Sequence, residues 1–125
     1  MSSSFEKEVK SRGVKTFLDF VILSILLNGK HGAYDILAKI HENLGLLLSP
    51  GIIYSVLHEI EKKGLVKAES PPPGGRKFSI TNKGIVWHKK MQKALTKFYD
   101  IISFFIYQQE KEEFSKVVKM LKPIE

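Results

Sequence analysis

The residues best suited to chemistry lie on one face of a short predicted helix that begins at Ser49-Pro50. At 100° per residue, the face opposite its apolar stripe presents Gly51, Ser55, His58 and Lys62. The serine hydroxyl can donate to or accept from base edges, and the histidine can donate to N7 or O6 acceptors in a major groove. Small residues let the backbone approach a groove closely, and the helix start at Ser49 is suited to a phosphate. The alternative is an ordinary solvated helix face.

Tyr54 lies on the flank of this face. Two interpretations stay open for it. Its hydroxyl contacts a phosphate, or its ring packs under the preceding helix.

A second polar group lies on a predicted β-hairpin and comprises Lys67, Arg76 and Lys77. Residues 65–70 and 76–80 predict two short strands, joined by a stiff Pro-rich and then Gly-rich tip. Cations beside such a turn are suited to reach the phosphates or the minor groove of a duplex. The alternative is an exposed hairpin without a partner, but three cations on one hairpin favour phosphate contact.

The residue pattern does not indicate a disulfide, a metal site or a catalytic site. The chain has no Cys, which excludes disulfides, thiolate metal sites and thiol nucleophiles. Its four histidines show no metal-ligand spacing such as i, i+4. We find no Ser-His-Asp set, paired-carboxylate site or Gly-rich phosphate loop, because Thr81-Asn82-Lys83-Gly84 predicts a helix start. We therefore expect no enzyme activity, no metal and no cofactor.

The charge of the chain is concentrated in one stretch. The 125 residues are 43% hydrophobic, which suits a single domain with a real core, and their net charge is +7. Residues 62–97 contain ten basic side chains against one acid, a net charge of +9, and the remaining residues together have a net charge of −2. A basic surface of this kind attracts nucleic acid or an anionic membrane.

Membrane insertion is not expected from the hydropathy pattern. The most apolar window, residues 17–27, has only 11 residues and includes an Asp and a Ser, whereas a membrane span needs about 20. The first residues do not resemble a signal peptide. The absence of Cys fits a reducing compartment, and we expect a cytoplasmic protein.

The apolar periodicity predicts three helices before the hairpin. A buried helix over about 16–27 ends at Asn28-Gly29, a second over 33–43 ends at Gly45, and the third spans 50–62. This order predicts a mainly α fold with a small β-hairpin, namely a winged helix-turn-helix with a long C-terminal helix. We expect an N-terminal arm or short helix over 1–15, the winged-helix domain over 16–81, and a helical dimerisation region over 82–125.

The long helix from 82 to about 107 indicates self-association. Its apolar residues Trp87, Met91, Leu95, Phe98, Ile102 and Phe105 are spaced 4, 4, 3, 4 and 3 apart, close to a heptad pattern. Apolar residues surround the helix axis from 98 to 107, so something must cover them. We predict a homodimer through Met91, Leu95, Phe98, Ile102 and Phe105. The alternative is that residues 110–122, a separate helix or a continuation, fold back over this surface.

Several motifs together resemble one known family. They are Phe17-Leu18-Asp19 with Ile22-Leu23, Tyr34-Asp35-Ile36, Leu48-Ser49-Pro50-Gly51-x-x-Tyr54, Leu57-x-x-Ile60-Glu61-x-x-Gly64-Leu65-Val66, and Gly74-Gly75-Arg76-Lys77-Phe78-Ser79-Ile80-Thr81-x-x-Gly84. Over residues 16–84 the chain resembles the PadR family of transcriptional regulators. It departs from the usual pattern at Ser55, where proline is common, at Ala33, where glycine is common, and over 85–125, where no motif matches.

The resemblance implies a repressor that binds double-stranded DNA as a dimer. Some members are released by phenolic acids, drugs or other small aromatics, so an aromatic effector would lie near Trp87 and Phe98. The alternative for these two residues is plain dimer core. The competing function is an architectural, chromatin-type protein that binds DNA without reading its sequence.

Overall fold

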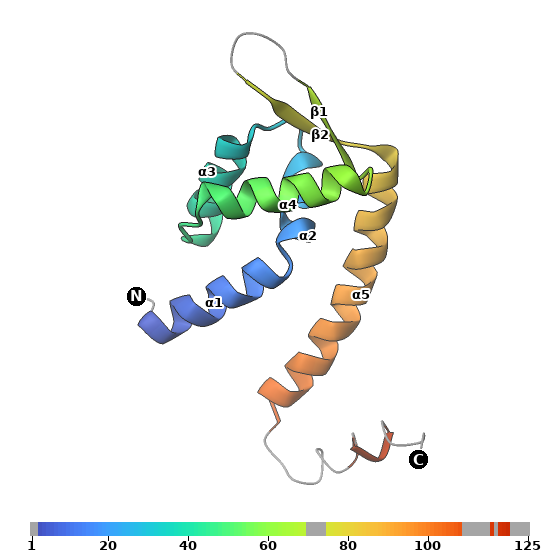
Figure 1. Cartoon of the computed structure of the whole chain (residues 1–125). Coiled ribbons are helices and arrows are strands. Elements are labelled where there is room, and N and C mark those ends of the chain that lie inside the picture. The colour runs from blue at the N-terminus through green and yellow to red at the C-terminus, as the bar shows by residue number, and fades with distance from the viewer. Residues whose placement is uncertain (1–2, 70–74, 109–115, 117, 121–125) are drawn as a thin grey trace. The chain divides into compact units, whose positions relative to one another are not determined.

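The computed structural model describes residues 3–69, 75–108, 116 and 118–120. The chain forms two compact units, residues 1–89 and 90–125. The elements follow the order α1 (Ser4–Thr16), α2 (Leu18–Leu26), α3 (Ala33–Leu44), α4 (Pro50–Lys62), β1 (Val66–Glu69), β2 (Lys77–Ile80) and α5 (Asn82–Ile106) (Figure 1). The predicted mainly α fold with one hairpin is confirmed.

The N-terminal segment is a helix rather than an extended arm. Ser3 accepts a hydrogen bond from the backbone N–H of Glu6, and the Glu6 carboxylate accepts one from the backbone N–H of Ser3, so α1 begins with a capping box. No residue of α1 is fully buried. Its Lys10 Nζ donates to the carbonyl of Leu44 at 2.9 Å, which satisfies one of the unpaired carbonyls at the end of α3.

The core of the first unit lies among α2, α3 and α4. Fully buried aliphatic side chains come from all three helices: Leu18, Ile22, Leu23, Leu26, Ile36, Ile40, Ile53, Leu57 and Ile60. The helix ends follow the predicted signals. Gly45 ends α3 with a left-handed φ of 68°, and its N–H donates to the carbonyl of His41.

The hairpin pairs antiparallel, with Val66 opposite Ile80 and Glu69 opposite Lys77. Phe78 and Val66 point into the core, so the alternate residues Lys67, Glu69, Lys77 and Ser79 share the outer face. An isolated bridge adds His31 to the sheet, because the N–H and C=O of His31 both pair with those of Phe78. This third sheet segment precedes α3.

Helix α5 is continuous over the predicted range and begins against the base of the hairpin. Thr81 Oγ1 accepts from the N–H of Gly84 and donates to the carbonyl of Gly64. Residues 82–89 of α5 belong to the first unit. The predicted helix over 110–122 falls largely outside the described residues. No helix in the described part of the chain is both long and apolar enough to cross a membrane.

Candidate nucleic-acid interface

The predicted contact face of α4 is the exposed side of that helix. Ser49 Oγ accepts from the N–H of Ile52 at 3.3 Å, and Pro50 occupies the first turn, so the helix starts where the sequence predicts. Ile53, Leu57 and Ile60 are buried on the opposite side. The four residues predicted to meet a groove are all exposed, namely Gly51, Ser55, His58 and Lys62.

The N-terminus of α4 is open to an approaching backbone. A Cβ built on Gly51 would meet nothing nearer than the Ser49 hydroxyl, at 3.9 Å. The Ser49 oxygen is the helix cap, but its hydroxyl hydrogen can still be donated to a phosphate. This end of the helix therefore combines a polar cap with open space beside Gly51 for an approaching phosphate.

Tyr54 packs against a second tyrosine, Tyr34, which is not among the predicted site residues. Its ring meets the ring of Tyr34, at the start of α3, edge to face with centroids 6.4 Å apart. Tyr54 is nonetheless 48% exposed and Tyr34 is 66% exposed. The pair extends the exposed polar face of α4 across to α3, and Tyr34 joins the candidate interface.

The outer face of the hairpin contains both cations and an acid. Lys67 and Lys77 are exposed on the same face as Glu69. Glu69 accepts a hydrogen bond from Lys30 Nζ at 2.8 Å, and this bond lowers the pKa of the Glu69 carboxyl below its usual value. Lys30, which precedes α3, is thus part of the hairpin surface although it lies 39 residues away in sequence.

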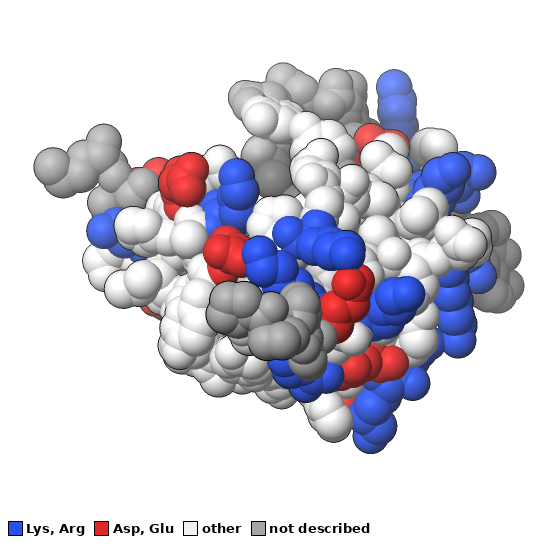
Figure 2. Space-filling model, turned by 90° about the horizontal axis from the view of Figure 1, so that it is seen from above, with Lys and Arg blue, Asp and Glu red and all other residues white. Residues whose placement is uncertain are grey.

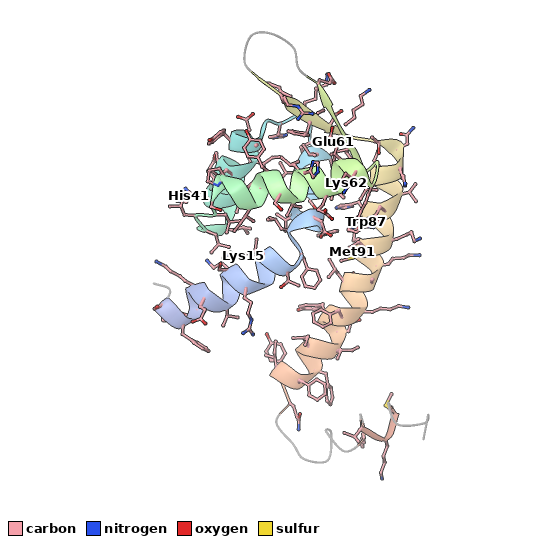
Figure 3. All side chains as sticks on the ribbon, viewed as in Figure 1. Lys15, His41, Glu61, Lys62, Trp87 and Met91 are labelled. Carbon is pink, nitrogen blue, oxygen red and sulfur yellow. The ribbon has the colours of Figure 1, made fainter. Side chains whose placement is uncertain are left out.

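Arg76 is exposed but has partners within the protein. Its Nη2 lies 3.4 Å from Oε2 of Glu61, and its guanidinium carbon lies 5.5 Å from the ring centroid of Phe78. Figure 3 places Glu61 on the C-terminal half of α4, next to Lys62. The residue pattern predicts a phosphate contact for Arg76 and no role for Glu61, because their pairing depends on how the hairpin folds back on α4.

The basic stretch is exposed but interrupted. All ten Lys and Arg residues between 62 and 97 are exposed, and seven of them belong to the first unit. In the view of Figure 2, blue basic side chains lie beside red acidic ones in several places. Two residues from outside this stretch join it: Glu61 of α4 adds a negative charge beside Arg76, and Lys30 adds a positive charge beside Glu69, so the two contributions cancel.

His88 is a buried polar residue to which the residue pattern gives no role. Its Nε2 lies 2.8 Å from the Ser24 hydroxyl, and its ring stacks on Phe20 at 4.5 Å between centroids. Burial lowers the pKa of His88 because it penalises the charged imidazolium. His88 thus attaches the start of α5 to α2. Among the described residues no cluster of His, Cys, Asp or Glu could hold a metal ion.

The two predicted effector residues lie in different units. Trp87 is half-buried against the core of the first unit, and Phe98 is 49% exposed in the second. An apolar groove of about 270 Å³ between α2 and α3 has neither residue in its lining, which includes Phe20, Ile25 and Ile40.

Comparison with known proteins identifies one family for the chain. The family model described as transcriptional regulator PadR-like matches residues 22–93. No curated protein sequence matches the chain.

Solved structures show the same fold. A transcriptional regulator from Clostridium thermocellum is 22% identical with a TM-score of 0.71, and the match covers 76% of this chain and 98% of that one. A PadR-like transcriptional regulator from Bacillus cereus is 19% identical with a TM-score of 0.70, over 78% and 99% of the two chains. A winged-helix DNA-binding protein from STIV is 17% identical with a TM-score of 0.58, over 63% and 87%. The first unit is therefore a winged helix, with α4 as its recognition helix and the β1–β2 hairpin as its wing.

Proposed function

The chain belongs to the transcriptional regulator PadR-like family, whose model covers more than half of it, and from this premise we propose that it is a dimeric, sequence-specific DNA-binding repressor. Membership makes it a DNA-binding transcriptional regulator rather than an enzyme. Sequence specificity, dimerisation, repression and effector release are our proposals.

The exposed face of α4 supports sequence-specific binding. Ser55 and His58 offer hydrogen-bonding groups at the spacing of one helix face, and both are open to solvent. Groups of this kind discriminate bases in the major groove, whereas the wing cations Lys67, Arg76 and Lys77 contact phosphates without reading sequence. The combination of a polar, uncovered recognition face with basic residues on the adjacent wing is the observation on which the proposal rests.

Exposed apolar side chains on α5 support the dimer. Phe98 is 49% exposed, Phe105 is 43% exposed and Ile102 is 39% exposed, at the predicted heptad spacing. Met91 and Leu95 continue the same stripe and are partly buried. Exposed apolar surface on this scale is typical of an interface. A two-fold dimer would place two recognition helices roughly 34–36 Å apart, one turn of DNA, and so would bind a palindrome.

The dimer is tested by the mass of the protein in solution. Wild type should have twice the chain mass of 14.2 kDa at micromolar concentration in sedimentation equilibrium. Phe105→Lys, which introduces a charge into the stripe, should shift the mass towards the monomer. Thr96→Lys is the matched control, because Thr96 is exposed on the same helix but outside the stripe. A monomeric wild type, or an unchanged Phe105→Lys variant, would contradict the proposed interface.

Sequence specificity is tested by comparing an operator with random DNA. The DNA upstream of the protein's own gene is the first probe, and footprinting should show a protected dyad. Ser55→Ala and His58→Ala should each reduce the preference for the operator while general affinity is retained. His41→Ala is the matched control, since His41 is an exposed histidine on α3. Equal binding of all duplexes by wild type would instead support the architectural alternative.

An aromatic effector is tested through the single tryptophan of the chain, Trp87. The sequence predicts the effector near Trp87 and Phe98, so binding of a phenolic acid beside Trp87 should quench its fluorescence and release DNA at the same ligand concentration. Release without quenching would place the effector elsewhere.

A further inference from the structure

The side chain of Arg76 is fixed by two elements at once. The Glu61 carboxylate of α4 lies 3.4 Å from its Nη2, and the Phe78 ring of β2 lies under its guanidinium at 5.5 Å. The guanidinium therefore connects the recognition helix to the wing. The pair is partly exposed, with 56% of the Arg76 side chain and 33% of the Glu61 side chain accessible.

The backbone at Arg76 is fixed as well. Two residues further along, the backbone of Phe78 forms two hydrogen bonds with the backbone of His31, at 3.1 and 2.8 Å. Gly32 lies directly against the carbonyl of Arg76, because a Cβ built on Gly32 would come within 3.2 Å of that oxygen. Arg76 thus has a fixed backbone and a fixed side-chain direction immediately before β2, at the turn side of the paired strands.

An exposed ion pair of this kind contributes little to folding stability. The Glu61 carboxylate also opposes general DNA binding, because it lies beside a cation that would otherwise attract phosphate. A role in orientation explains the pair better than a role in stability or affinity. Arginine suits it, because the planar guanidinium presents its donors in a fixed direction once one edge is paired.

We propose that Glu61 is a positioning residue, which holds Arg76 in one orientation so that the wing and the recognition helix dock on the duplex in a single register. Glu61 then lowers affinity for random DNA and raises the preference for the operator. This inference rests on the proposed sequence-specific function.

The chain offers a matched control in Glu59. At 100° per residue, Glu59 and Glu61 lie on opposite flanks of the exposed face of α4, at similar angles from it. Glu59 is exposed and forms no ion pair with any residue that the structure describes. Glu59→Gln and Glu61→Gln therefore change the charge of the same helix by the same amount, but only the second removes a partner of Arg76.

The experiment measures binding of wild type, Glu61→Gln and Glu59→Gln to operator and random duplexes over a series of salt concentrations. Both variants should bind random DNA more tightly than wild type, because each loses a negative charge near the phosphates. Only Glu61→Gln should reduce the ratio of operator to random affinity, by about 2–5-fold, the range set by the coupling in an exposed ion pair. Its salt dependence should also steepen, by up to about 0.9 in log–log slope, because the charge of Arg76 is no longer neutralised by Glu61 where the wing meets the phosphates.

A double-mutant cycle separates orientation from charge. In an Arg76→Gln background, Glu61→Gln should leave the ratio unchanged, because no guanidinium remains to be positioned. Equal changes in operator and random affinity for Glu61→Gln would overturn the inference, and so would a reduced ratio that persists without Arg76. A wild-type protein without any operator preference would overturn the proposed function itself, and this inference with it.

Discussion

Gly84 is expected to be the least replaceable glycine of the winged-helix unit. It lies in the first turn of α5, is buried, and has no room for a side chain. A Cβ at this position would overlap the carbonyl oxygen of Leu65 and Cγ1 of Ile80. The same carbonyl accepts the N–H of Thr81 at 3.0 Å, so the backbone there cannot move without loss of a hydrogen bond.

The magnitude follows from two opposing effects in Gly84→Ala. Overpacking costs about 1–3 kcal/mol, and a clash with backbone rather than with a flexible side chain favours the upper end, about 3 kcal/mol. Alanine is the better helix former by about 1 kcal/mol. We therefore expect Gly84→Ala to reduce the free energy of unfolding by about 2 kcal/mol.

Gly13→Ala provides the matched comparison. Gly13 lies in exposed helix α1, and a Cβ there would meet nothing within 4 Å. This variant should gain stability, by up to about 1 kcal/mol. The assay is urea unfolding followed by circular dichroism at one protein concentration, since self-association shifts the apparent stability. A Gly84→Ala protein as stable as wild type would show that α5 does not begin against Leu65 as described.

Three further changes test the fold and the interface. The pKa of buried His88 is lowered, so the unfolded chain takes up the proton first, and wild type should lose stability as pH falls from about 6.5 through the lower folded-state pKa. In urea titrations, His88→Gln should lose less unfolding free energy than wild type between pH 7.5 and pH 5. Equal losses in the two proteins would contradict this role of His88. Ser49→Ala should reduce the free energy of unfolding by about 1 kcal/mol through loss of the cap, an idea that an unchanged urea midpoint would refute. Lys77→Gln should reduce the salt slope of DNA binding by about 0.9, whereas Lys39→Gln on α3 should leave it unchanged.

Signals confined to a few neighbouring residues predicted the elements well. Ser49-Pro50 marks the start of α4 and Gly45 the end of α3, and both positions are confirmed. Such signals succeed because caps, turns and apolar periodicity act within one or two helical turns. The exposed face of α4 was predictable for the same reason, since the apolar stripe fixes which side of the helix is buried.

The amino-acid sequence by itself determined the order of the elements, the solvent-facing side of α4 and the concentration of positive charge in residues 62–97. Only the tertiary structure decided which charges remain free to meet DNA and which polar groups join the elements. The pairs Arg76–Glu61, Lys30–Glu69 and Ser24–His88 join residues 15, 39 and 64 positions apart. No local pattern encodes such pairs, because each depends on where packing of the apolar core brings two separate elements together.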